Sequence, residues 1–202
     1  MLVRDVMSQP VVSVEPQTPV RAAAAILTDR GFTALPVVDR DGELVGLVTE
    51  ADLLRGRVHH DARSALLGEE LDATPPPSTV GDVMAAEVFT TRPLADVADL
   101  VAQMRARGLR SVPVLGEDGR VEGIVSRRDV LQTMTRADAA IAADVRHCLE
   151  TYAGPGRWTV DVEDGVVTLG DAFTDVVERH AARVIAASVR GVVDVRVASL
   201  QN

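Results

Sequence analysis

The sequence predicts a mixed α/β protein (α+β), in which two copies of one strand-helix-strand-strand-helix unit precede a smaller helix-strand-strand-helix-strand unit. Three observations support this prediction. The chain repeats itself at a spacing of 77 residues, each copy combines a helical apolar stripe with short apolar strands, and the last third follows a new pattern. With 202 residues, 47% of them hydrophobic, the chain can form two or three small cores.

The repeat is visible when the chain is aligned with itself at an offset of 77 residues. Positions 5–54 and 82–131 then match without a gap and share 17 identities in 50 pairs. Average residue usage would give roughly 6% identity by chance. Both copies begin with "DVM", and both contain a heptad, "GLVTEAD" at 46–52 and "GIVSRRD" at 123–129. The chain therefore contains two copies of one structural unit.

Each copy carries the signals of an amphipathic helix followed by two strands. Apolar residues recur at i, i+3, i+4 and i+7 from Val20 in the first copy and from Val97 in the second. Thr18 with Pro19 predicts the start of the first of these helices, and Gly31 predicts its end. Two short apolar strands joined by an Asp-Gly turn come next, and a second helix follows directly. The heptad therefore lies at the last strand-to-helix junction.

These elements divide the chain into four segments. The first copy occupies residues 1–57 and the second occupies 80–134. Between them lies a linker, 58–79, which ends in three prolines and contains "ARSALLGEEL", a sequence that predicts a short helix. The third unit occupies residues 137–202.

The heptad places a hydroxyl and a carboxylate at the start of a helix: Thr49 with Asp52, and Ser126 with Asp129. Unpaired amides and the helix dipole at such a place favour a phosphate, and a carboxylate can accept two hydrogen bonds from a ribose. The glycine that opens each heptad would let a flat base lie close to the backbone. The same residues also fit a structural capping box that follows a β-bulge. Spacing alone leaves both interpretations open.

These motifs resemble those of CBS domains, regulatory modules that occur in tandem pairs called Bateman modules. The resemblance rests on the two "DVM" motifs, the "LPVVD" and "RDG" stretches and the two heptads, and it covers residues 1–134. It implies a pseudo-twofold disc with two clefts between the copies, a homodimer formed through the CBS domains, and a bound AMP, ATP or S-adenosylmethionine. The heptad hydroxyls, at Thr49 and Ser126, would contact phosphate, and the carboxylates of Asp52 and Asp129 would contact ribose.

Basic residues distinguish the second copy from the first. Arg110 occupies a position that often carries a phosphate ligand in nucleotide-binding relatives, and Arg127 and Arg128 lie within the second heptad. The first copy has Thr, Glu and Ala in these places. Because arginine makes bidentate contacts with phosphate and Glu50 would repel it, we expect a phosphorylated ligand in the cleft that holds Asp129 and Arg110. Arg127 and Arg128 also fit a solvated surface.

The last third predicts a helix, a hairpin turning at Asp164 and Gly165, a second helix and a final strand. This order, together with "DGVVTLGD" and a late "GVVDV", resembles a BON domain over residues 137–202. That family is associated with phospholipid membranes, envelope components and, in some proteins, small-molecule sensing. Ten acids against six arginines in residues 138–202 imply only a weak contact with anionic phospholipid. Trp158 fits an interfacial anchor or a packing residue.

Composition and the remaining motifs argue against several function classes. All 21 basic residues are arginine against 30 acids, which argues against nucleic-acid binding, and no apolar run approaches the roughly 18 residues of a membrane span. The start of the chain has no export signal, so we expect a cytoplasmic protein. His59 and His60 cannot share a helix face, and Cys148 lies on an apolar stripe, so we expect neither a metal site nor a catalytic thiolate. Without a recognisable nucleophile or phosphate-binding loop, no enzyme is predicted.

The sequence therefore predicts a regulatory protein. Its CBS pair would bind an adenosine-containing ligand, with no catalytic cofactor, and its BON unit would relay occupancy to an unidentified protein partner. The alternative is a ligand-free scaffold that docks on a protein or membrane, in which the heptads only cap helices. The carboxylates of Asp52 and Asp129 distinguish the two, because binding requires them whereas a scaffold should tolerate asparagine.

Overall fold

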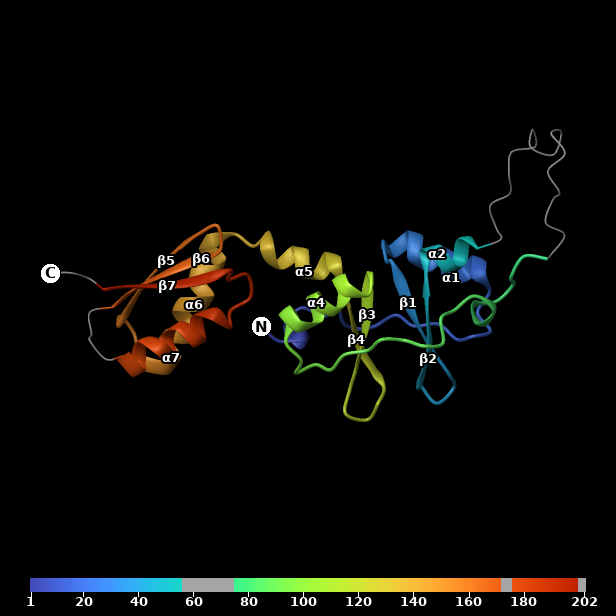
Figure 1. The fold of residues 1–202 in the computed structure, drawn as a ribbon, viewed down its shortest axis with the longest axis horizontal. Helices are drawn as coiled ribbons and strands as arrows, with labels where there is room; N and C mark the ends of the chain where they lie inside the picture. The colour runs from blue at the N-terminus through green and yellow to red at the C-terminus, as the bar shows by residue number, and fades with distance from the viewer. Residues whose placement is uncertain (56–74, 172–175, 200–202) are drawn as a thin grey trace, which may run out of the picture.

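The computed structural model of the chain describes residues 1–55, 75–171 and 176–199. The two copies lie next to each other, and the C-terminal unit lies at one end of the longest axis (Figure 1). The first copy contains a 3-10 turn at Val3–Asp5, α1 (Val20–Arg30), β1 (Ala34–Val38), β2 (Leu44–Thr49) and α2 (Glu50–Leu54). The second contains a 3-10 turn at Val80–Asp82, α4 (Val97–Ala106), β3 (Ser111–Leu115), β4 (Val121–Ser126) and α5 (Arg127–Met134). The predicted linker helix, His59 and His60 lie outside the described residues.

The helix, two strands and second helix predicted for each copy are confirmed, but the first strand is not. In its place each copy has a single parallel bridge, Val14 with Val37 and Thr91 with Val114. Proline follows two residues after each bridge, at Pro16 in the first copy. Because proline has no N–H to donate, the ladder cannot continue.

The ends of the first helices were predicted in part. Gly31 has φ +64° and terminates α1, as expected from its sequence position. Thr18 does not cap this helix, because its hydroxyl accepts a hydrogen bond from the N–H of Glu15 (3.1 Å). In the second copy Asp96 caps α4 by accepting from the N–H of Ala98 (2.7 Å), a cap that the sequence analysis did not identify.

The leading residues of each copy pack into the other copy. We call residues 3–8 the first arm and residues 80–85 the second arm. Side chains of the first arm join the core of the second copy, and those of the second arm join the core of the first. The N-terminus accordingly lies beside α4 (Figure 1). The contributing arm residues are Val3 and Val6 in one core and Val80 and Val83 in the other.

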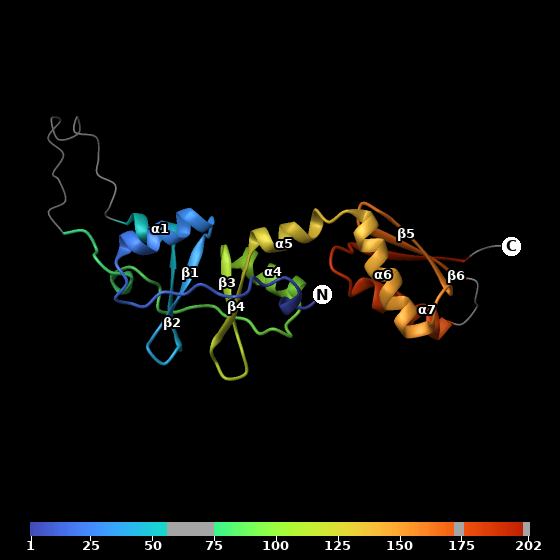
Figure 2. The same cartoon turned by 180° about the vertical axis from the view of Figure 1, so that it is seen from behind.

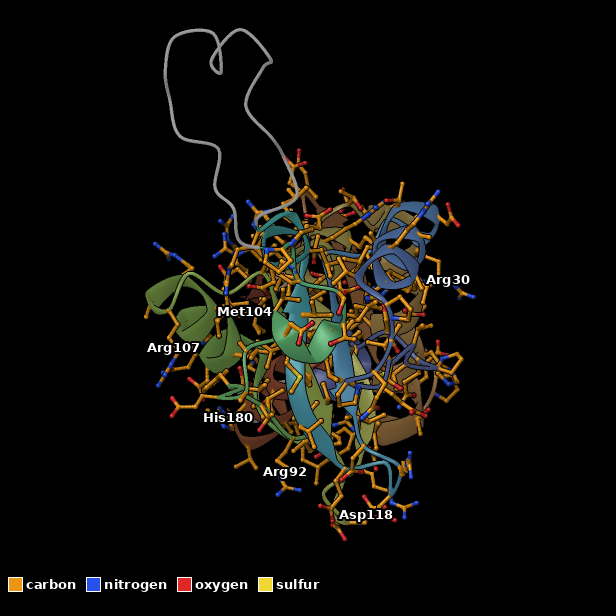
Figure 3. All side chains as sticks on the ribbon, turned by 90° about the vertical axis from the view of Figure 1, so that its right-hand side faces the viewer. Arg30, Arg92, Met104, Arg107, Asp118 and His180 are labelled. Carbon is orange, nitrogen blue, oxygen red and sulfur yellow. The ribbon has the colours of Figure 1, made fainter. Side chains whose placement is uncertain are left out.

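Backbone hydrogen bonds fix the exchanged arms symmetrically. The N–H of Ser8 donates to the carbonyl of Ile124 (2.9 Å), and the N–H of Leu47 donates to the carbonyl of Ala85 (2.9 Å). Equivalent positions therefore fall on opposite sides of the pair. Figure 3 shows this for Arg30 and Arg107, which occupy the same position in the two copies. The pair has approximate two-fold symmetry, and neither core is complete without the other copy.

The C-terminal unit has the order predicted from the sequence. It contains α6 (Asp138–Ala153), β5 (Trp158–Glu163), β6 (Val166–Asp171), α7 (Val176–Ala187) and β7 (Asp194–Ser199). Strand β6 is central, antiparallel to β5 and parallel to β7. The predicted turn is present, with positive φ at Asp164 and Gly165. Trp158 is 8% exposed and packs in the core of this unit, which is the behaviour of a packing residue. Cys148 is partly buried against the same core.

Helix α5 leads directly into the C-terminal unit (Figure 2). A Cβ atom at Gly191 would lie 3.1 Å from the carbonyl oxygen of Thr133, so the α7–β7 turn packs closely against the end of α5. Arg136 reinforces this junction by donating to the carbonyl of Arg190 (2.7 Å) and to the carboxylate of Asp144 (2.7 Å). The C-terminal unit is thus attached to the end of the helix that carries the second heptad.

Candidate functional site

A cavity of ≈ 270 Å³ lies between the two copies and contains part of the second heptad. We call it the Asp129 cleft. One wall comes from the first copy, from the end of its arm and the turn between α1 and β1, and the other comes from β3, β4 and α5. The lining residues are Ser8, Pro10, Val11, Val12, Arg30, Gly31, Phe32, Thr33, Ala34, Ser111, Ile124, Ser126, Arg128, Asp129 and Gln132.

Both heptads form complete capping boxes. The hydroxyl of Ser126 donates to Oδ2 of Asp129 (2.6 Å), the N–H of Ser126 donates to the same oxygen (2.7 Å), and the N–H of Asp129 donates back to the hydroxyl (3.3 Å). Thr49 and Asp52 repeat this arrangement at the start of α2. The capping interpretation of the heptad is therefore confirmed in both copies.

The cap engages only one oxygen of each aspartate. The other oxygen of Asp129, Oδ1, accepts a hydrogen bond from the hydroxyl of Ser8 (3.0 Å), and both residues line the cleft. In the first copy, Oδ1 of Asp52 instead lies 3.2 Å from Nη2 of Arg55. Asp129 therefore presents a carboxylate oxygen whose present partner is a hydroxyl, which a ribose hydroxyl could replace without loss of a hydrogen bond.

Two arginines lie at the Asp129 cleft, Arg128 from the second copy and Arg30 from the first. A Cβ atom at Gly31 would lie 3.8 Å from Nη1 of Arg128, so this guanidinium covers the turn that follows Arg30. Within the described residues, neither guanidinium has an ion-pair partner. Two uncompensated cations on one cavity favour an anionic ligand. Arg30 was not predicted from the sequence, although its position beside the glycine that ends α1 brings it to the opposite copy.

The side chain of Arg110 lies away from the predicted cleft. It does not line the Asp129 cleft, and its Nη1 lies 3.8 Å from Oε2 of Glu50 in the first copy. The expectation that the Arg110 side chain and Asp129 share one cleft is wrong, because only the backbone of Arg110 contacts its own heptad, through its carbonyl and the N–H of Arg127, whereas its guanidinium reaches Glu50 of the other copy. Arg110 therefore belongs with the first heptad, in what we call the Asp52 region (Glu50, Asp52, Arg55 and Arg110).

Arg127, predicted as a ligand residue, makes structural contacts instead. Its Nε donates to the carbonyl of Leu109 (2.8 Å) and its Nη2 to the carbonyl of Met104 (3.3 Å), at the end of α4. A cation there satisfies helix carbonyls and complements the helix dipole. Arg127 is not among the residues that line the Asp129 cleft. The next residue, Arg128, does line this cleft.

The glycine of each heptad makes room for an exchanged arm rather than for a base. A Cβ atom at Gly46 would lie 2.6 Å from Sδ of Met84 and 3.1 Å from the carbonyl oxygen of Ala85. At Gly123 the corresponding neighbours are Sδ of Met7 (2.9 Å) and the backbone of the first arm. The arm occupies the space that a Cβ atom would need, so these glycines are explained without a ligand. Both glycines lie beside a β-bulge, the structural alternative that the sequence left open.

Two further expectations concern the chain as a whole. Over residues 1–55, 75–171 and 176–199, no helix has the length and apolar character needed to cross a bilayer. In the same ranges, no three His, Cys, Asp or Glu side chains gather in an arrangement suited to a metal ion.

The family model of the CBS domain matches the chain twice, at residues 3–59 and 80–136. The chain belongs to the CBS domain family. Its CBS pair is similar to two solved structures with ligands: CBSX2 in complex with AMP, and the CBS domain pair of protein MJ0100 in complex with 5′-methylthioadenosine and S-adenosyl-L-methionine. The former is 28% identical with a TM-score of 0.53 and the latter 26% identical with a TM-score of 0.52. Each match covers 65% of this chain, with 93% and 94% of the respective relatives.

Curated relatives place the CBS pair in different settings. An uncharacterized protein of Methanocaldococcus jannaschii is 25% identical over 154 residues, covering 66% of this chain and 91% of that protein. The inosine-5′-monophosphate dehydrogenase of Thermoplasma acidophilum is also 25% identical, over 181 residues and 90% of this chain. The chain spans only 32% of the length of that dehydrogenase.

Proposed function

We propose that this CBS pair senses an adenosine-containing ligand in the Asp129 cleft and that the C-terminal unit relays occupancy to a protein partner. The observation that carries the proposal is the composition of the cleft. Asp129, with its Oδ1 oxygen, lines the cavity together with the apolar Val12 and Ile124. Arg30 and Arg128 also line it, and neither has an ion-pair partner within the part of the chain that the structure describes. Relatives that bind AMP and S-adenosyl-L-methionine support the ligand class.

Each part of such a ligand has a counterpart in the cleft. The base packs against the apolar wall, and the ribose hydroxyls donate to Oδ1 of Asp129 in place of Ser8. A phosphate lies beside Arg128 at the start of α5, where the positive end of the helix dipole adds to the attraction. Of the first three amides of this helix, those of Arg127 and Asp129 already donate to the carbonyl of Arg110 and the hydroxyl of Ser126, so the guanidinium of Arg128 supplies the main contact. The cavity volume of ≈ 270 Å³ is near the lower end of ligand pockets, roughly 300–1,000 Å³, and suits a mononucleotide better than a dinucleotide.

Helix α5 is the proposed route of the relay. Its first turn carries Asp129, and Gln132 also lines the cleft. Its other end contacts the C-terminal unit through Thr133 and, just beyond it, Arg136. The helix is only about 12 Å long, so a ligand that tilts its start also displaces the junction. Coupling of this kind amounts typically to about 1–3 kcal/mol and is limited by the ligand's differential affinity for the two arrangements.

The C-terminal unit and a homodimer complete the proposal. The helix-strand-strand-helix-strand order supports assignment of this unit as a BON domain that binds the partner protein, with at most a weak phospholipid contact because the unit is acidic. For dimerisation, the supporting observation is that Leu54 and Leu131, equivalent positions on α2 and α5, are both 59% exposed. An isologous interface requires a surface that is complementary to itself, and a pseudo-symmetric apolar face supplies one.

The ligand proposal is tested by thermal unfolding with AMP, ADP, ATP and S-adenosylmethionine. Asp129→Asn and Asp52→Asn form a matched pair, because each keeps an acceptor for its cap and removes one charge. A ligand at 100 times its Kd stabilises the wild type by about 2.7 kcal/mol. We expect this stabilisation to disappear in Asp129→Asn and to persist in Asp52→Asn. Loss in Asp52→Asn alone would reassign the cleft, and no response to any ligand would refute the sensor.

The relay needs a separate measurement, hydrogen exchange of residues 176–199 with and without the ligand. Occupancy should change protection of the turn around Gly191 in the wild type. In Arg136→Ala the nucleotide should still bind, but the change in protection should be reduced. An unchanged exchange pattern in the wild type would refute the relay while leaving the binding site intact.

A ligand-free scaffold remains the second candidate function. The observation that favours it is that both heptads form complete capping boxes, which need no ligand to explain Asp52 and Asp129. A scaffold should bind its partner equally well with and without nucleotide, and should retain that binding in the double variant Asp52→Asn/Asp129→Asn.

A further inference from the structure

The two heptads of the pair share one backbone arrangement but differ in how their charges are paired. Glu50 and Arg127 occupy equivalent positions, 77 residues apart, directly after the capping hydroxyl. In the second copy Arg127 turns to the end of α4 and leaves the Asp129 cleft to Arg30 and Arg128. In the first copy the equivalent place holds an acid whose side chain faces the other copy.

Every arginine of the Asp52 region has an intramolecular partner. Nη1 of Arg110 lies 3.8 Å from Oε2 of Glu50, with both side chains more than half exposed, and Nη2 of Arg55 lies 3.2 Å from Oδ1 of Asp52. Arg107, at the position equivalent to Arg30, lies over the ring of Phe89 at 4.8 Å from its centroid. The Glu50–Arg110 pair joins the two copies across this region.

A phosphate in the Asp52 region would meet a different set of charged side chains from one in the Asp129 cleft. An exposed ion pair is weak, so the contact itself is not a steric barrier. The phosphate would nevertheless have to compete with Glu50 for Arg110 and would be repelled by the Glu50 carboxylate within a few ångströms. Among the described residues that line the Asp129 cleft, the single carboxylate is Asp129, which is also the residue suited to ribose.

We propose that Glu50 excludes phosphorylated ligands from the Asp52 region, so that each chain binds one anionic nucleotide, in the Asp129 cleft. Glu50 is then the specificity-determining residue that sets the stoichiometry. The inference rests on the proposed nucleotide-binding function and adds to it a number of sites and a chemical reason for the difference between them. Arg110 becomes available to phosphate only when Glu50 loses its charge.

The test is isothermal titration of the full chain with AMP and with ATP, comparing wild type, Glu50→Gln and Glu43→Gln. Glu43→Gln is the matched control, because it makes the same change of charge at the other end of β2, roughly 20 Å away along the strand. We expect one site per chain in the wild type and in Glu43→Gln. Glu50→Gln should gain a second site, which binds at least tenfold more tightly than any binding there in the wild type.

A second variant distinguishes this assignment of Arg110 from a direct contribution to the Asp129 cleft. Arg110→Thr introduces the residue found at the equivalent position 33 and should leave the single wild-type site unchanged. In the Glu50→Gln background it should abolish the second site. Thermal unfolding of each variant without ligand checks that the fold is intact.

The outcomes separate this inference from the proposed function. Two equal sites in the wild type, or one site in Glu50→Gln, would overturn the exclusion by Glu50 while the nucleotide-binding function stands. Loss of the wild-type site in Arg110→Thr would also overturn it. If no variant binds either nucleotide, the inference fails, and the proposed function then stands only if S-adenosylmethionine or ADP stabilises the chain in the thermal unfolding experiment.

Discussion

Shortening Val3 should destabilise the second copy rather than the copy to which it belongs in sequence. Val3 is fully buried, and its neighbours in the core are residues of α4, β3 and β4. Val3→Ala removes two methyl groups, which contribute about 1.6 kcal/mol by transfer, and the remaining cavity raises the expected loss to about 2–3 kcal/mol. For a CBS pair of about 130 residues, this corresponds to a fall in Tm of roughly 5–12 °C.

Hydrogen exchange read by mass spectrometry locates the effect. Val3→Ala should raise exchange mainly in α4, β3 and β4, and Val80→Ala, the equivalent change in the second arm, should raise it mainly in α1, β1 and β2. Each variant thus loosens the copy to which it does not belong in sequence, and each serves as the control for the other. If Val3→Ala instead loosened the first copy more than the second, the exchange of arms would be refuted.

Three further changes test individual contacts. Gly46→Ala should lower stability by about 1–2 kcal/mol in urea unfolding without any ligand, because the new Cβ forces the second arm to shift; loss of ligand binding at unchanged stability would refute this. Arg127→Ala should cost about 1 kcal/mol through the end of α4 and leave nucleotide affinity unchanged, which titration of the variant would check. Hydrogen bonds from the backbone N–H and the hydroxyl of Thr79, and from Ser78, lower the pKa of Asp82 below its ordinary 3.8. Its folded pKa is depressed, so its stabilising contribution is present above the ordinary value and is lost as the pH falls through the folded value. Asp82→Asn should therefore lose less stability than the wild type between about pH 6 and about pH 2.5, and an equal loss in both would contradict this origin of the acid sensitivity.

Local signals predicted most of the fold. The stripe that starts at Val20, the terminating Gly31 and the hairpin at Asp164 and Gly165 act within a few residues, so sequence spacing is sufficient to place them. Thr18 was misplaced because its hydroxyl has a competing acceptor role toward Glu15, three residues earlier. The predicted first strand of each copy is absent for a local reason too, because a proline two residues beyond the single bridge interrupts the hydrogen-bonded ladder.

The exchange of arms could not be read from the repeat. The two copies have the same apolar pattern, so the sequence is equally compatible with each arm packing in its own copy or in the other. Arg110 illustrates a second limit of sequence spacing, since its backbone contacts the heptad of its own copy while its guanidinium reaches Glu50 in the heptad of the other. Arg30 reaches the cleft for the same reason, because the end of α1 lies against Arg128 of the other copy, a contact between residues far apart in sequence. The capping contacts of Ser126 and Asp129 lie within one turn, so their spacing was sufficient to predict them.

The exchanged arms also predict how a chain with only one of the two repeats would behave. A chain holding one repeat alone would expose the groove that receives an arm and would carry an arm with no groove of its own to fill. Two such chains satisfy both needs at once by domain swapping, in the arrangement that the two halves adopt within this single chain. The internal symmetry is that of a homodimer whose subunits have been joined by a linker. We expect a single repeat prepared on its own to dimerise through this interface. The full chain already contains both halves of the interface and gains nothing by self-association there at the same concentration.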